Sequence, residues 1–191
     1  MQYKLTTPCT AEDLAPLKAG DTVLLSGVVY TARDQAHKRM LEALDKGEKL
    51  PFDLEGSAIY YVGPTPERPG EIIGSAGPTT SGRMDAMSPR LLDLGNKIMI
   101  GKGKRDAAVK EAVVRNGAVY LAALGGAGAL MAQSVKTLEV IAWPDLGCEA
   151  VRRLTVEDMP LTVILDAHGG DLYLSGPAAY KRQQGEGAKA L

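Results

Sequence analysis

Gly-Pro-Thr-Thr-Ser-Gly-Arg-Met-Asp, residues 77–85, is the most informative stretch of this chain for both its fold and its chemistry. A short apolar run precedes it, and apolar residues at helical spacing follow it. That order predicts a strand, a tight turn and a helix whose first turn contains Arg83. Unpaired backbone N–H groups at a helix N-terminus, next to an arginine, can receive a carboxylate or a phosphate. A capped helix with Arg83 in solvent explains the same residues, so the stretch alone leaves both interpretations open.

A second turn of this kind is Thr-Ala-Arg-Asp-Gln-Ala-His-Lys-Arg, residues 31–39, which follows another strand-like run. Thr31 and Asp34 have the spacing of a capping box, which predicts that a helix starts here. Arg33 and His37 are four residues apart and therefore share a face of that helix. A cation near the positive end of a helix dipole is unfavourable unless an anion lies beside it. A solvated Arg33 with a partly buried His37 is the alternative, and spacing alone does not decide between the two.

The third turn is Gly101-Lys102-Gly103, which follows a short strand-like run and precedes a helix headed by Asp106. Glycines on both sides of a lysine let the backbone and the ammonium approach a bound anion. The spacing matches neither a Walker A loop nor the G-x-G-x-x-G fingerprint, because Asp106 stands where the third glycine belongs. The glycine cluster at 125–128 also lacks the full fingerprint, so an ordinary turn is the default there and a nucleotide site is disfavoured.

Each of the three turns presents one cation: Arg33, Arg83 and Lys102. A small dicarboxylate needs several such donors, because both of its carboxylates must be paired when they leave water. We therefore expect the three cations to converge on one pocket sized for a four-carbon diacid.

Composition narrows the class of protein. A chain of 191 residues fits one domain, and a net charge of −1 gives no general attraction to nucleic acid or to an anionic membrane. Only 5% of the residues are aromatic, which argues against a base-stacking surface. No apolar run approaches the roughly 18 residues of a membrane span, and the N-terminus lacks the apolar region of a signal peptide. We expect a cytoplasmic protein that binds neither nucleic acid nor membrane.

Strand-like and helical segments alternate along the chain, which predicts an α/β fold with a mixed sheet. We expect a single domain over residues 1–182 and a flexible tail over 183–191, which is polar and contains glycine. His168 lies in a turn-forming sequence and is expected to be a hairpin residue. Strands are expected at 3–6, 22–31, 58–62, 71–75, 97–101, 119–123, 138–143, 151–156 and 162–166, and helices at 33–46, 83–94, 106–116 and 127–134.

Taken together, these motifs resemble the β subunit, or equivalently the C-terminal domain, of the class I iron–sulfur fumarate hydratases and their tartrate dehydratase relatives. The resemblance implies a swivelling β/β/α domain like that of aconitase-type enzymes. It covers nearly the whole chain, from Leu5 to about Tyr180, and its two long motifs at 31–39 and 77–85 are highly specific in combination. The other matching segments are Ser26-Gly27, Gly101-Lys102-Gly103, Gly125-Gly126, Asp145-Leu146-Gly147 and Val156-Glu157-Asp158-Met159-Pro160.

The resemblance implies reversible hydration of fumarate to (S)-malate at a [4Fe–4S] cluster. By position in the motifs, Arg33, Thr80, Arg83 and Lys102 would hold the substrate carboxylates, and His37 would orient Arg33 or contact substrate. Thr79 corresponds to the threonine proposed as the base, paired with an acidic residue of the other subunit. A threonine base requires its alkoxide to be stabilised by Arg83, Lys102 and helix N–H groups, so a purely hydrogen-bonding role for Thr79 stays open.

Cysteine counting supports a subunit independently of the resemblance. A cluster of this kind needs three or four thiolate ligands, whereas this chain has two cysteines, Cys9 and Cys148, with no C-x-x-C spacing. We expect both to be small buried apolar residues and the cluster to be bound by a cysteine-bearing α subunit. Pairing of two αβ units into a heterotetramer is expected from the symmetry of oligomers and from the resemblance.

Two positions in the motifs bear on the choice of substrate. Tartrate-type relatives often have Cys where Ala32 stands and Glu where Asp85 stands, so the two residues of this chain favour fumarate as the substrate. Mesaconate or another unsaturated diacid stays open, as does a non-catalytic module that binds an anion for regulation. Many relatives continue the lysine turn as Gly-Asn-Arg, whereas this chain has Gly103-Lys104-Arg105, which makes the geometry of this turn a point for the structure to settle.

Overall fold

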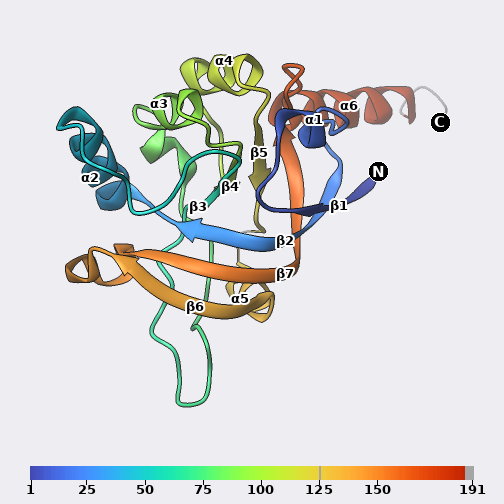
Figure 1. Ribbon diagram of the computed structural model, residues 1–191. Helices are drawn as coiled ribbons and strands as arrows, with labels where there is room; N and C mark the ends of the chain where they lie inside the picture. The colour runs from blue at the N-terminus through green and yellow to red at the C-terminus, as the bar shows by residue number, and fades with distance from the viewer. Residues whose placement is uncertain (125, 188–191) are drawn as a thin grey trace.

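The computed structural model describes residues 1–124 and 126–187 and has a mixed α/β fold, as predicted (Figure 1). Its seven strands form one sheet in the order β1-β2-β3-β4-β5-β7-β6, and β2 also pairs with β7. The second pairing joins β2, β3, β4, β5 and β7 into a closed ring. The strands are β1 (Gln2–Thr6), β2 (Thr22–Thr31), β3 (Ala58–Tyr60), β4 (Ile98–Gly101), β5 (Val119–Ala122), β6 (Val135–Ala142) and β7 (Val151–Leu165).

Strand direction determines where functional loops can meet. Strands β1 to β5 run parallel to one another, whereas β7 runs antiparallel to β2, β5 and β6. The carboxyl ends of β2, β3, β4 and β5 therefore lie along one edge of the ring. Ligands of parallel sheets bind beyond this kind of edge, and the turns after β2 and β4 both carry predicted cations.

Side chains on one face of the strands fill the inside of the ring, and side chains on the other face pack against helices outside it. Alternating strand residues such as Leu25, Tyr60 and Ile100 belong to the inner core cluster. Their neighbours, such as Ile59 and Met99, belong to a separate cluster with side chains of α2, α3 and α4. The helical segments are α1 (Ala11–Leu14), α2 (Asp34–Asp45), η1 (Ser81–Met84), α3 (Ser88–Asp93), α4 (Ala107–Arg115), α5 (Gly128–Gln133), η2 (Pro144–Glu149) and α6 (Leu172–Gly187), where η marks a 3₁₀ turn.

Two of the predicted elements around the quoted stretch are wrong. Residues 71–75 are not a strand but part of a projecting loop between β3 and η1 (Figure 1), in which Ile72 is 47% exposed. The helix predicted at 83–94 is broken into η1 and α3. Pro89, in the first turn of α3, has no N–H to continue a helix from η1, so the helix starts again at Ser88.

The C-terminal third also differs from expectation. The strands predicted at 151–156 and 162–166 form one long strand, β7, and η2 and α6 were not predicted. Near the N-terminus, α1 was not predicted either. His168 lies in a turn closed by Gly169 N–H donating to Asp166 O, but this turn leads into α6 instead of a second strand. Of the expected tail 183–191, the part to Gly187 belongs to α6, and residues 188–191 lie outside the described residues. Within the described ranges, no helix has the length and apolar character that a membrane crossing requires.

Candidate functional site

Two of the predicted cations meet at one carboxylate oxygen. Arg33 lies where β2 ends and α2 begins, and its Nε donates to Asp34 Oδ2 at 3.1 Å. Arg83 comes from η1, and its Nη2 donates to the same oxygen at 2.5 Å. The turns at 31–39 and 77–85, which are far apart in sequence, are thus joined through Asp34.

Thr79 lies next to this pair. Its Oγ1 accepts a hydrogen bond from Arg83 Nη2 at 3.4 Å, and its backbone N–H donates to the carbonyl of Tyr61 just beyond β3. The side chain of Thr79 is partly exposed. The Thr79 hydroxyl and Arg83 are therefore neighbours, as predicted, although Arg83 lies in the 3₁₀ turn η1 and not in a long helix.

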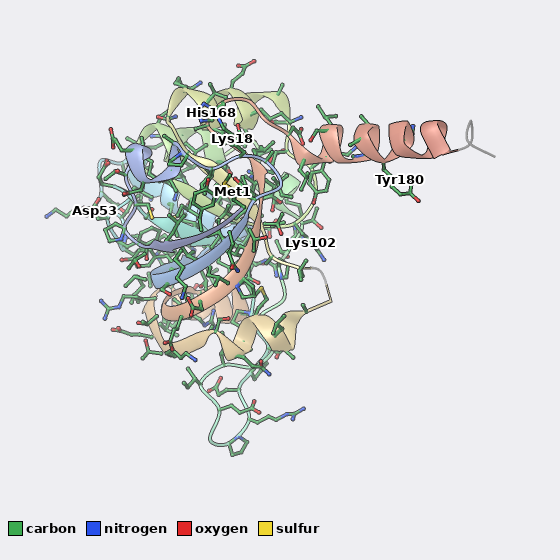
Figure 2. All side chains as sticks on the ribbon, turned by 90° about the vertical axis from the view of Figure 1, so that its right-hand side faces the viewer. Met1, Lys18, Asp53, Lys102, His168 and Tyr180 are labelled. Carbon is green, nitrogen blue, oxygen red and sulfur yellow. The ribbon has the colours of Figure 1, made fainter. Side chains whose placement is uncertain are left out.

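The lysine turn lies alongside the same segment. Thr80 and Lys102 form an isolated parallel bridge, Ser81 N–H donates to the Lys102 carbonyl at 2.9 Å, and Lys102 N–H donates to Ser81 Oγ at 3.0 Å. The Lys102 side chain is exposed, on the side of the molecule from which α6 projects (Figure 2). Its ammonium has no hydrogen-bond or ion-pair partner within the part of the chain that the structure describes. The structure thus brings Thr80 and Lys102 side by side, one residue beyond Thr79.

Buried hydroxyls fix the two loops against each other. Tyr120 OH lies 2.9 Å from Ser81 Oγ and 3.0 Å from the Gly103 carbonyl, and burial raises the pKa of Tyr120, so its hydroxyl remains a donor. Gly103 N–H donates to Tyr173 OH of α6 at 3.1 Å. These bonds set the position of the backbone that carries Lys102.

A buried arginine beneath the loops was not predicted. Arg105 has a fully buried side chain whose Nε donates to Asp85 Oδ1 at 2.5 Å and whose Nη2 donates to Ser88 Oγ at 2.9 Å. Its guanidinium lies 5.4 Å from the ring centre of Tyr61 and 5.0 Å from that of Tyr120. A charge buried this deeply needs such partners, so Arg105 is bound into the fold and is not available to a ligand.

Asp85 has a different partner from the one expected. Asp85 lies two residues after Arg83, but its carboxylate pairs with Arg105 and accepts the backbone N–H of Asp106 at 2.7 Å. Asp106 caps α4 as predicted, by accepting the N–H of Val109. The departure Gly103-Lys104-Arg105 thus keeps the arginine that ties the lysine turn to η1.

His37 is buried behind Arg33. It has no exposed surface, its Nδ1 lies 3.2 Å from the Arg33 carbonyl, and its ring makes an edge contact with Tyr61 at 5.2 Å. Burial lowers the pKa of His37 to about 4, so the ring is neutral at physiological pH. Nε2 has no hydrogen-bond partner in the described structure. This geometry favours support of Arg33 over direct contact with a ligand.

The chain itself supplies anions at the start of α2. Glu149 of η2 accepts the N–H of Gln35 at 2.8 Å, and its other oxygen lies 3.6 Å from Arg33 Nη2. The predicted capping box is not formed, because the Thr31 hydroxyl donates to Ala150 O and accepts from Arg152 N–H instead. Glu149 was missed because it lies 114 residues from Gln35, and no local pattern links the two.

The cysteines do not form a metal site. Cys9 is buried, as expected, and burial raises the pKa of its thiol to about 11, whereas Cys148 is exposed, contrary to expectation. Among residues 1–124 and 126–187, no group of three or more His, Cys, Asp or Glu side chains is arranged to hold a metal ion. The described residues therefore do not fit the ligand set that a [4Fe–4S] cluster requires.

A closed mixed sheet with cations on the loops at its carboxyl edge defines an α/β domain with a candidate anion site. The sequence model described as "Fumarase C-terminus" matches residues 1–176, and the chain belongs to this family. It is 39% identical over 168 residues to "Fumarate hydratase 2" of Leishmania major, a match that covers 85% of this chain and 29% of the relative. The chain thus spans less than a third of that enzyme.

Shorter relatives are matched along most of their length. The chain is 42% identical over 170 residues to "Putative L(+)-tartrate dehydratase subunit beta" of Methanocaldococcus jannaschii, covering 86% of this chain and 87% of the relative. It is 34% identical over 177 residues to "L(+)-tartrate dehydratase subunit beta" of Escherichia coli K12, covering 90% and 87%. The family therefore includes chains named as separate subunits as well as chains named as fumarate hydratases.

Proposed function

We propose that this chain is the β subunit of a two-subunit iron–sulfur hydro-lyase that reversibly hydrates fumarate to (S)-malate. The observation that carries the proposal is the meeting of Arg33 and Arg83 beside Thr79, with Lys102 held on the adjoining loop. Membership of the fumarase C-terminus family supports the same chemistry. The turns can form without cations, so their own geometry does not explain three cations at this edge of the sheet. Binding of a small diacid explains them, because both of its carboxylates must be paired.

Each cation has donors left for a ligand. Arg83 binds Asp34 and Thr79 through Nη2 alone, so Nε and Nη1 have no acceptor among the described residues. Each of these two atoms can donate to an oxygen of a bound carboxylate. Lys102 and the Thr80 hydroxyl bind the second carboxylate in this proposal. His37 holds the Arg33 carbonyl and so supports the turn without touching substrate.

Thr79 is the candidate base. In the dehydration direction the Thr79 alkoxide takes the proton from the carbon next to a carboxylate. The double bond forms as the hydroxyl on the neighbouring carbon takes a proton from the acidic residue of the partner subunit and leaves as water, and Thr79 then returns its proton to that residue. Pairing of the two substrate carboxylates with Arg83 and Lys102 stabilises the charge that develops in the transition state. The same cations lower the cost of the Thr79 alkoxide. If Thr79 only hydrogen-bonds substrate, the binding part of the proposal is unchanged.

The cluster is assigned to a partner, a cysteine-bearing α subunit. The two cysteines of this chain and the separation of Cys9 from the exposed Cys148 support this division of the active site. A heterotetramer of two αβ units in the cytoplasm completes the proposal, since paired units are the common form of such assemblies.

L(+)-tartrate is the second candidate substrate. The identity of 42% to a relative named as a putative L(+)-tartrate dehydratase β subunit favours it. Both diacids carry two carboxylates on a four-carbon chain, so the same three cations serve either one.

The test is an anaerobic assay of this chain co-expressed with the α subunit, with fumarate and L(+)-tartrate as substrates. We expect fumarate hydration by the wild-type complex and a loss of at least about 100-fold in kcat/KM for Arg83→Ala or Lys102→Ala. Arg90→Ala and Lys104→Ala are matched controls, because both residues are exposed and lie outside the proposed site. Thr79→Ala tests only the role of the base.

The outcomes separate the parts of the proposal. A cluster-loaded complex in which Arg83→Ala and Lys102→Ala turn over like wild type would show that the site is wrongly assigned. Turnover of tartrate but not of fumarate would select the second candidate. A loaded complex that turns over no diacid would leave an anion-binding module in place of an enzyme.

A further inference from the structure

Asp34 stands between two positive charges that would otherwise repel each other. One of its oxygens, Oδ2, accepts from both Arg33 Nε and Arg83 Nη2. Like charges at this separation are unfavourable unless an opposite charge lies between them. The contact also joins α2 to η1, two elements that the chain reaches 49 residues apart. The relative position of the two guanidiniums therefore depends on Asp34.

Asp34 is well placed to keep its charge. Its side chain is 28% exposed, and burial alone opposes ionisation. Hydrogen bonds from its own backbone N–H, from Arg33 and from Arg83 outweigh that effect and lower the pKa of the carboxyl. The carboxylate is therefore ionised at neutral pH.

The contacts of Asp34 occupy only part of each guanidinium. Arg33 uses Nε for Asp34 and directs Nη2 toward Glu149, which leaves Nη1 without an acceptor among the described residues. Likewise, Nε and Nη1 of Arg83 have no acceptor among the described residues. If Asp34 competed with a ligand, it would occupy these donors. It leaves them available to a ligand instead.

We propose that Asp34 is a positioning residue that holds Arg33 and Arg83 as a pair, with their open donors directed at one carboxylate of a four-carbon diacid. The inference rests on the proposed function for the identity of the ligand. Asp34 does not itself touch the reacting atoms. A partly exposed ion pair that served only the fold would contribute little to stability and nothing to ligand affinity.

The test measures binding of succinate, an unreactive four-carbon diacid, to the αβ complex by calorimetry. Asp34→Asn keeps the shape of the side chain and removes its charge, and we expect affinity to fall about 10-fold or more. KM for substrate should rise more than kcat falls. Asp45→Asn is the matched control, because Asp45 ends the same helix and pairs with Arg90 on the surface. Its succinate affinity should equal that of wild type.

Two further measurements make the inference falsifiable. If Asp34 acts through the two arginines, the triple variant Asp34→Asn/Arg33→Ala/Arg83→Ala should bind succinate no more weakly than the double variant Arg33→Ala/Arg83→Ala. In the full-length chain, NMR relaxation of arginine Nε–H groups should show Arg33 and Arg83 rigid in wild type and mobile in Asp34→Asn.

Wild-type affinity in Asp34→Asn, tighter binding in it, or arginines that stay rigid without the charge would each overturn the inference. A wild-type complex that binds no diacid would refute the proposed function and the ligand named here. The arginine relaxation would still decide whether Asp34 holds the pair, so the two failures can be told apart.

Discussion

At the scale of single residues, His37 links the site to the stability of the fold. The folded protein keeps this ring neutral, with a pKa lowered by burial to about 4, whereas an exposed histidine titrates near 6.5. The unfolded chain therefore binds a proton first as pH falls. The contribution of His37 to stability is complete above pH 6.5 and is lost between pH 6.5 and 4. The difference between the two pKa values corresponds to about 3 kcal/mol of unfolding free energy.

This pH dependence is measurable by denaturant unfolding of the full chain across that range. We expect His37→Gln to lack part of the decrease in unfolding free energy that wild type shows between pH 6.5 and 4. His168→Gln is the control, because His168 is exposed and its ring bonds to the Ala15 carbonyl on the surface. Equal pH slopes for wild type and His37→Gln would show that His37 is already solvated in the folded state.

Residue types at turns were enough to predict side chains that the structure brings near one another. Arg33, Arg83 and Lys102 were identified because each follows a strand-like run in the sequence, and a cation in a turn needs an anion nearby. Arg105 and Glu149 were not identified, because their partners lie 20 and 114 residues away in sequence. Their roles are set by tertiary packing, which no local spacing records.

At the scale of elements, the end of β4 sets the position of the lysine turn. Gly101 is its last residue, and a Cβ there would lie 2.0 Å from Ser81 Oγ. Gly101→Ala must therefore displace Ser81, whose hydroxyl accepts the backbone N–H of Lys102. We expect a loss of about 1–3 kcal/mol in unfolding free energy together with weaker diacid binding.

Gly82→Ala is the matched control for this prediction. The nearest heavy atom to a Cβ at Gly82 lies 3.5 Å away, an ordinary contact, although Gly82 belongs to the same 3₁₀ turn as Ser81. Calorimetric unfolding of both variants compares them directly. A Gly101→Ala protein that unfolds like wild type would mean that the loop packs less tightly against β4 than the structure indicates.

Regular elements with strong periodicity were predicted well, and irregular ones were not. Strand β2 and helix α2 were located to within a residue or so because their apolar residues recur at fixed spacing. The segment 83–94 was wrongly predicted as one helix because its apolar residues have helical spacing. Pro89 interrupts the hydrogen bonding that one continuous helix would need. Around the site, the loops hold their shape through side-chain hydrogen bonds and not through helix continuation.

At the scale of the whole molecule, closure of the ring brings the site together. Strand β7 pairs with β5 on one side and with β2 on the other, so the parallel strands β2 to β5 curve around a common core. The turn after β2 thereby contacts η1 through Asp34 and Arg83, and the turn after β4 bonds to Ser81 of η1. The α/β class with a mixed sheet followed from the order of elements, but the double pairing of β2 did not, because no sequence pattern specifies long-range strand partners. The aconitase-type swivel stays a prediction.

The most direct test of the central claim is a crystal structure of the αβ complex with a bound four-carbon diacid. We predict one diacid in contact with Arg33, Arg83 and Lys102, with Thr79 Oγ1 within hydrogen-bonding reach of a substrate carbon that loses a proton. A diacid bound elsewhere, with these three cations unchanged and facing solvent, would contradict the account.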